Sequence, residues 1–177
     1  MQNSVELKLR KTVAKLAYKE TEKISVSALC KKADISRASF YLYYKDIDDL
    51  TEKNREYIIN KLDEQMNIIF DIQYASREGK CRIVFTDDDR ALLKGFIGKN
   101  VYWDFAVAAN RIITPRFNKK MIERYGENYY NENKEKFEFI LNGSMASLCL
   151  DLLNYNEETL IKNMQRITKI ADEIFER

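Results

Sequence analysis

The segment KKADISRASFYLYYKD, residues 31–46, places several strong hydrogen-bond donors close together. Arg37, Ser39, Tyr41, Tyr43 and Lys45 carry a guanidinium, a hydroxyl, two phenols and an ammonium group. Such groups donate to phosphate oxygens, and an arginine also pairs with the edge of a guanine base. Carried on one short helix, they predict a surface that faces a nucleic acid.

The charge of the chain is placed unevenly. The whole sequence carries a net charge of only +2. Residues 1–45 hold ten Lys and Arg against four Asp and Glu, whereas residues 46–177 hold 20 against 24. The N-terminal end is therefore expected to meet an anion, and the remainder is mildly acidic.

Several classes of protein fit the composition poorly. The chain has no histidine, which removes the commonest general base and the commonest metal ligand. Cys30, Cys81 and Cys149 lie far apart and are odd in number, so a disulfide framework or a zinc site is not expected. No apolar run approaches the roughly 20 residues of a membrane span. We expect a cytoplasmic protein without a metal, a cofactor or a membrane partner, and not an enzyme.

The spacing of apolar residues predicts an all-α fold. The sequence contains one Pro and five Gly, and its apolar residues recur at helical intervals. A first helix is expected at about 5–20. Ser25 is expected to cap a short second helix and Ser36 a third over 37–43, with a three-residue turn between them, which is the helix-turn-helix pattern.

The rest of the chain is expected to be helical apart from one connector. Asp46 is expected to cap a long helix over 47–72. A connector over 76–89 follows, with a short extended run at 82–85. The expected later helices are 87–98, 100–113, 114–125 with Thr114 as cap and Pro115 at its first position, 133–154 and 156–175, with Gly98 and Gly126 as stops.

Residues 35–47 divide into an inner and an outer face. Phe40 and Tyr44 are one turn apart and are expected to pack inward with Ile35 and Ile47. The outward residues, together with the two capping serines, form the predicted DNA-binding set: Arg37, Ser39, Tyr41, Leu42, Tyr43, Lys45, Ser25 and Ser36. The alternative reading of the aromatic cluster is ordinary core packing, which we adopt for Phe40 and Tyr44 only.

Residues 24–50, ISVSALCKKADISRASFYLYYKDIDDL, resemble the DNA-binding domain of the tetracycline-repressor (TetR) family. That family shows the pattern [ST]-[FL]-Y-x-[HY]-[FY]-K in its recognition helix, and Ser39 to Lys45 match it in order. The resemblance covers about residues 5–55, and beyond them only the helical layout is shared. Asp34 stands where the family usually has glycine, and Tyr43 stands where histidine is common.

The resemblance implies a helix-turn-helix domain at 1–50 and a helical effector-binding and dimerisation domain at 51–177. It also implies a homodimer on a near-palindromic operator, acting as a repressor that a small effector releases. The last two helices would form a four-helix bundle with those of a second copy. The apolar stripe on these helices is wider than one partner helix needs, so we expect these residues at the interface between two copies: Phe137, Leu141, Met145, Leu148, Leu152, Ile167 and Ile170.

The middle helices are expected to enclose a pocket for a hydrophobic or aromatic effector. Its predicted lining is Phe96, Tyr102, Trp103, Phe105, Asn110 and Phe117. The alternative for these aromatic residues is plain core packing. Two alternatives to the effector-responsive regulator remain at this stage: an adaptor of the same fold that binds DNA and a protein partner without an effector, and an enzyme whose basic end is incidental.

Overall fold

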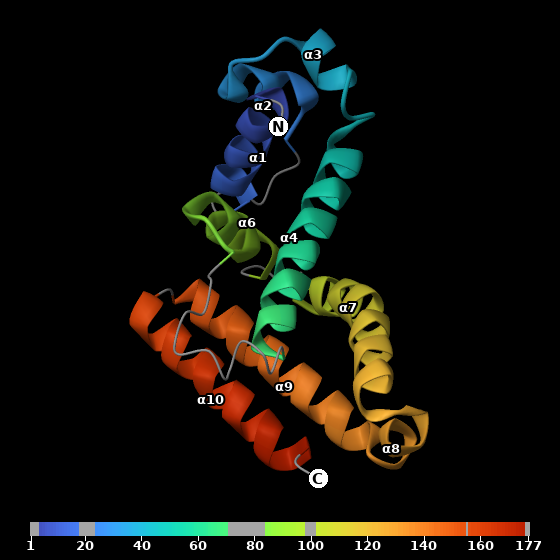
Figure 1. Cartoon of the computed structure of the whole chain (residues 1–177). Helices are drawn as coiled ribbons and strands as arrows, with labels where there is room; N and C mark the ends of the chain where they lie inside the picture. Colours follow the sequence, from blue (N-terminus) through green and yellow to red (C-terminus); the bar gives the residue numbers. More distant parts are fainter. Residues whose placement is uncertain (1–3, 18–23, 71–83, 98–101, 155, 176–177) are drawn as a thin grey trace. The chain divides into compact units, whose positions relative to one another are not determined.

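In the computed structural model of the chain, all regular secondary structure in the described residues is α-helical (Figure 1). The description covers the whole chain except 1–3, 18–23, 71–83, 98–101, 155 and 176–177. The helices are α1 (Ser4–Ala17), α2 (Val26–Ala33), α3 (Arg37–Tyr41), α4 (Ile47–Ile69), α6 (Asp87–Ile97), α7 (Tyr102–Tyr125), α8 (Glu127–Glu132), α9 (Lys134–Leu153) and α10 (Glu157–Phe175). The prediction of an all-α protein is confirmed.

The chain groups into two compact units. Unit 1 comprises Met1–Ile58 and Phe85–Ala106, and unit 2 comprises Ile59–Val84 and Val107–Arg177. Unit 1 therefore contains α1, α2, α3, α6 and the first half of α4. Unit 2 contains the second half of α4, most of α7, and α8 to α10.

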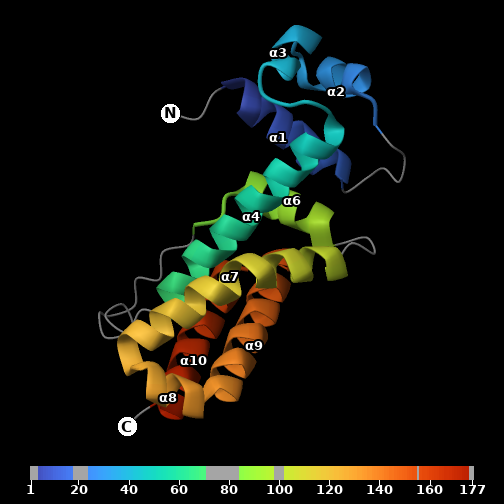
Figure 2. The same ribbon diagram turned by 90° about the vertical axis from the view of Figure 1, so that its right-hand side faces the viewer.

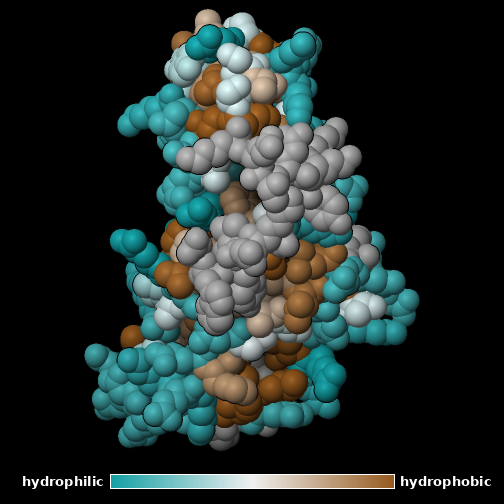
Figure 3. Space-filling model, turned by 180° about the vertical axis from the view of Figure 1, so that it is seen from behind, coloured by the Kyte–Doolittle hydropathy of each residue, from teal (hydrophilic) through white to brown (hydrophobic). Residues whose placement is uncertain are grey.

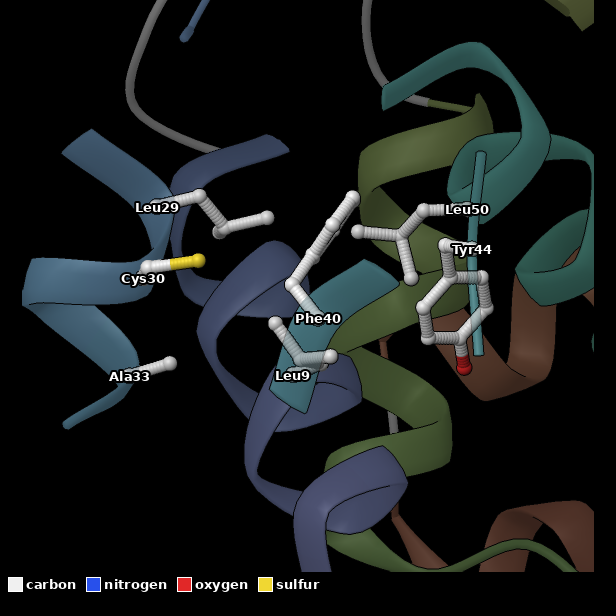
Figure 4. Close-up of a cluster of buried hydrophobic side chains, with 7 residues drawn as sticks. All are labelled: Leu9, Leu29, Cys30, Ala33, Phe40, Tyr44 and Leu50. Carbon is white, nitrogen blue, oxygen red and sulfur yellow. The ribbon is translucent and has the colours of Figure 1, made fainter. Parts of the chain in front are cut away.

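The core of unit 1 is a small apolar cluster built from its N-terminal helices. Its buried members are Leu9, Leu29, Cys30, Ala33, Phe40, Tyr44 and Leu50, and Figure 4 shows Phe40 in the middle of them. Ile35 and Ile47 pack against this cluster, so the predicted inner face is confirmed. Helix α6 joins the same unit along α1, where the Lys11 ammonium lies 3.0 Å from the Asp88 carboxylate.

The core of unit 2 is formed by long helices and a group of aromatic rings. Helices α9 and α10 lie side by side and run in opposite directions (Figure 1, Figure 2). Phe137 on α9 is completely buried, and its ring lies 5.3 Å from Tyr130 and 5.6 Å from Tyr125 between centroids. Phe117 of α7 joins this group at 6.4 Å from Phe137.

Two of the expected helices are in fact one. Helix α7 runs without interruption through Pro115, so the predictions of a break there and of Thr114 as a cap are wrong. The reason is the buried stripe at four-residue intervals that continues across the proline: Phe105, Ala109, Ile113, Phe117 and Met121. Burial along this stripe outweighs the one backbone hydrogen bond that a proline removes.

Other boundaries differ by smaller amounts. Gly126, with a φ of 86°, ends α7 as predicted, but the short helix α8 that begins after it was not expected. Helix α3 ends at Tyr41, two residues earlier than predicted, and α4 ends at Ile69. The predicted end of the first helix at 18–20, most of the connector, including Arg82 and Ile83, and Gly98 lie outside the described residues.

Candidate nucleic-acid interface

Capping interactions that the sequence predicts hold the starts of α2 and α3. The hydroxyl of Ser25 accepts a hydrogen bond from the Ala28 amide at 3.2 Å, and the hydroxyl of Ser36 accepts one from the Ser39 amide at 2.9 Å. Asp34 adopts a φ of 52°, in the left-handed region. Aspartate tolerates this conformation better than most residues, so the turn forms without the usual glycine.

Below α3, aromatic packing fixes how the helix is rotated about its axis. Phe40 is completely buried, and Tyr44, one turn later, is almost completely buried. The Phe40 ring meets Tyr41 edge to face at 5.4 Å and Tyr44 at 5.6 Å between centroids. Because Phe40 points into the core, the opposite side of α3 must face away from unit 1.

The predicted donors lie on that outward side and in the residues that follow α3. Arg37, Tyr41 and Lys45 are exposed, and the Arg37 guanidinium lies 6.0 Å from the centroid of the Tyr41 ring. Tyr43 is half-buried. These cations and phenols have the chemistry required for phosphate contacts, and an exposed guanidinium can also reach a base edge.

The two serines at the start of α3 serve the helix as well as its surface. The hydroxyl oxygens of Ser36 and Ser39 lie 2.8 Å apart, and Ser39 is half-buried. Ser25 and Ser36 both use an oxygen lone pair for their caps. A hydroxyl keeps further hydrogen-bonding capacity beyond one such bond, so a phosphate contact remains compatible with capping.

After α3, a reciprocal cap joins residues 42–45 to α4. The Lys45 amide donates to the Asp49 carboxylate at 2.9 Å, and the Asp49 amide donates to the Asp46 carboxylate at 2.8 Å. The backbone bond from Lys45, followed by the side-chain bond from Lys53, holds the pKa of the Asp49 carboxyl below its ordinary value. The cap fixes where the Lys45 side chain leaves the backbone.

Lys53 is a contributor that the sequence reasoning missed. Its ammonium donates to the Tyr43 carbonyl at 2.9 Å and to the Asp49 carboxylate at 3.1 Å. It therefore ties Tyr43, two residues after α3, to the second turn of α4. A lysine four residues after a capping aspartate was the available signal, since such pairs meet on one side of a helix.

A second contact missed from the sequence joins α1 to α4. The Arg10 guanidinium lies 3.6 Å above the centroid of the Tyr57 ring and donates from Nε to the Asn54 carbonyl oxygen at 3.3 Å. Asn54 is buried, and among the described residues neither its Nδ2 nor the Nη1 of Arg10 has a hydrogen-bond partner. The sequence indicated this contact only through Asn54, a polar residue at an inward position of α4.

The residues predicted to line an effector pocket fall into different units. In unit 1, Phe96 and Phe105 are buried and stack on each other at 5.9 Å between centroids. In unit 2, Phe117 packs against Phe70 at 5.1 Å between centroids, and the buried Oδ1 of Asn110 has no hydrogen-bond partner in the part of the chain that the structure describes. The side chains of Tyr102 and Trp103 lie outside the described part of the chain.

The predicted dimer stripe is covered by its own chain. Five of its seven residues are buried in the single chain, Ile167 is half-buried and Ile170 is exposed; the buried ones are Phe137, Leu141, Met145, Leu148 and Leu152. The expectation that one chain leaves this stripe uncovered is wrong. Rings from α7 and α8 cover Phe137, and α10 packs along α9.

A different face of α9 is exposed. Phe139 and Leu150 are exposed to 76% and 60%, and Gly143 and Ala146 lie exposed between them. An open groove of about 620 Å³ adjoins this face and is lined by Glu135, Lys136, Phe139 and Ile174. Figure 3 shows one face of the molecule, on which hydrophobic (brown) side chains reach the surface among hydrophilic (teal) ones.

Comparisons with known proteins give no relative for this chain: no family model, no curated protein and no solved structure matches it. Within the described residues, no helix is long and apolar enough to cross a membrane. The same part of the chain contains no group of three His, Cys, Asp or Glu residues that could hold a metal ion.

Proposed function

We propose that this chain is a sequence-specific DNA-binding regulator of transcription whose α2-turn-α3 segment enters the major groove. The observation that carries the proposal is the exposure of Arg37 and Tyr41 on a helix whose other side is anchored by Phe40, and of Lys45 in the segment that directly follows this helix. In a helix-turn-helix, the second helix lies in the groove and its exposed side chains contact bases and phosphates. The excess of positive charge in residues 1–45 supports a polyanionic partner.

The test is binding to duplex DNA selected by the protein from a random library. We expect Lys45→Ala to weaken binding to every duplex and to lower the slope of log affinity against log salt by about 1, as loss of one phosphate contact does. Tyr41→Phe, which removes only the phenolic oxygen, is also expected to weaken binding. Lys119→Ala is the matched control, because Lys119 is an exposed lysine of unit 2 on α7. If Lys45→Ala and Tyr41→Phe bound every duplex as tightly as wild type, the proposed contacts of these two residues with DNA would be wrong.

We propose that the active form is a homodimer and that the two chains meet through the exposed face of α9. The proposed interface consists of the four exposed residues Phe139, Gly143, Ala146 and Leu150, in place of the buried stripe that the sequence suggested. Small residues at the centre of such a face permit close approach of a second helix. A symmetric pair would place two α3 helices about 34 Å apart on a near-palindromic site, one turn of DNA. Wild-type protein that sediments as a monomer at micromolar concentration and still binds such sites would contradict it.

The release of DNA by a small effector is part of the same proposal. The supporting observation is the buried Oδ1 of Asn110, an acceptor that has no partner among the described residues and that lies on a helix with several aromatic residues. A hydrophobic or aromatic molecule with one donor would satisfy that oxygen. A thermal-shift screen of such compounds, followed by a DNA-release assay, tests it. A chain that binds DNA but responds to no compound would favour the adaptor alternative.

A further inference from the structure

The exposed side of α3 also carries an apolar row that phosphate binding does not use. Ala38 and Leu42 lie one helical turn apart and are both exposed, Leu42 to 78%. The Leu42 amide donates to the Ala38 carbonyl at 3.2 Å, and its φ and ψ of −70° and −24° continue the helical conformation. The Leu42 side chain therefore projects from a backbone that the helix holds in place.

This apolar row runs beside the row of donors. Arg37 and Tyr41 are likewise one turn apart, and each precedes a member of the apolar row by one position. Leu42 does not pack into the core cluster of unit 1, because Phe40 and Tyr44 form the buried side of this segment. The outward face thus combines cations and phenols with one large uncovered aliphatic side chain.

We propose that Leu42, with Ala38 beside it, recognises the 5-methyl group of thymine in the major groove; this inference rests on the proposed DNA binding. The thymine methyl is the apolar group that the major groove presents among its donors and acceptors. Positions 38 and 42 are separated by about 6 Å along a helix axis. Bases of one strand follow each other at about 3.4 Å, so the two side chains suit thymines about two steps apart. Leu42 is then a determinant of specificity, whereas Lys45 supplies affinity.

The proposal is tested by removing single methyl groups from DNA. A duplex selected by the wild-type protein is resynthesised with deoxyuridine in place of one thymidine at a time, which deletes the methyl and keeps the base pairing. We expect one or two positions in each half-site at which the wild type loses about fourfold in affinity, the factor that corresponds to one buried methyl group. At the position that Leu42 contacts, Leu42→Ala should bind the thymine and uracil duplexes equally, whereas a position that Ala38 contacts should stay sensitive.

Three further variants make the result specific. Leu42→Met keeps an apolar side chain of similar reach and should retain sensitivity to the methyl group. Lys45→Ala should bind more weakly overall but show the wild-type pattern of sensitive positions. Val107→Ala removes an exposed aliphatic side chain on α7 and should leave both affinity and pattern unchanged. Because Leu42 is exposed, its variants should keep the wild-type circular dichroism spectrum and melting temperature.

Two outcomes overturn the inference, and they are distinguishable. If the protein selects a duplex but Leu42→Ala is as sensitive to uracil as wild type at every position, or if no position is sensitive, the thymine contact is wrong and DNA binding stands. If the protein selects no duplex at all, the proposed function fails and the inference fails with it.

Discussion

Phe137 and Phe139 are separated by one residue on α9, and the structure predicts different consequences for their replacement by alanine. Phe137 is completely buried, with the rings of Tyr130 and Tyr125 at 5.3 Å and 5.6 Å between centroids. Replacement of a buried phenylalanine by alanine lowers the free energy of unfolding by about 3–5 kcal/mol, and the lost ring contacts place Phe137→Ala at about 4 kcal/mol.

Phe139 is exposed to 76%, so only about a quarter of its surface is covered within the chain. Full burial of such a side chain is worth about 2–3 kcal/mol, so Phe139→Ala should cost about 0.6 kcal/mol in the isolated chain. If the exposed face of α9 is the dimer interface, however, Phe139→Ala should shift the protein from dimer to monomer. The two substitutions thus separate a role in the core from a role at an interface.

The assay is urea denaturation followed by circular dichroism at several protein concentrations, together with sedimentation velocity. We expect the wild-type midpoint to rise with concentration, as it does for a dimer, and the Phe139→Ala midpoint not to depend on it. Phe137→Ala should unfold at much lower urea at every concentration. These two roles would be contradicted if Phe137→Ala lowered the free energy of unfolding by less than about 1 kcal/mol. Equal destabilisation of the two variants at low concentration would contradict them as well.

Three smaller predictions concern buried or capping groups. Burial raises the pKa of the Cys149 thiol to about 12, so it should not react with a thiol reagent at pH 8 until the protein unfolds; prompt reaction of the native protein would contradict this. The Tyr130 hydroxyl is buried and has no hydrogen-bond partner within the described residues, so Tyr130→Phe should leave stability unchanged or raise it by about 1 kcal/mol in denaturation experiments. The lowered pKa of Asp49 gives stability that is present above the unfolded-state pKa of about 3.9 and is lost as pH falls through the lower folded-state pKa. Between pH 5 and pH 2, the free energy of unfolding of Asp49→Asn should therefore fall less than that of wild type.

Local chemistry made the helix-turn-helix segment predictable from the sequence. Ser25, Ser36 and Asp46 cap the helices that follow them through bonds to residues only three positions away. The inward position of Phe40 and Tyr44 also follows from helical spacing alone. These features depend on neighbours in the chain, so no knowledge of tertiary packing was needed.

Features that depend on distant segments were missed or misjudged. The width of the apolar stripe on α9 suggested a second copy, but α7, α8 and α10 of the same chain cover it. Pro115 suggested a helix boundary, whereas the buried stripe of α7 continues through it. The contact of Arg10 with Asn54 and Tyr57 joins residues more than forty positions apart, which no local pattern specifies.

The most direct measurement of the central claim is fluorescence anisotropy of a labelled duplex, selected by the wild-type protein, titrated with wild type and with Arg37→Ala over a series of salt concentrations. We expect wild-type affinity to fall steeply with salt, and Arg37→Ala to bind more weakly and to discriminate less between the selected duplex and a scrambled one. Lys119→Ala should match wild type in both respects. Binding that is insensitive to salt, or equal for wild type and Arg37→Ala on both duplexes, would contradict a DNA-reading role for α3.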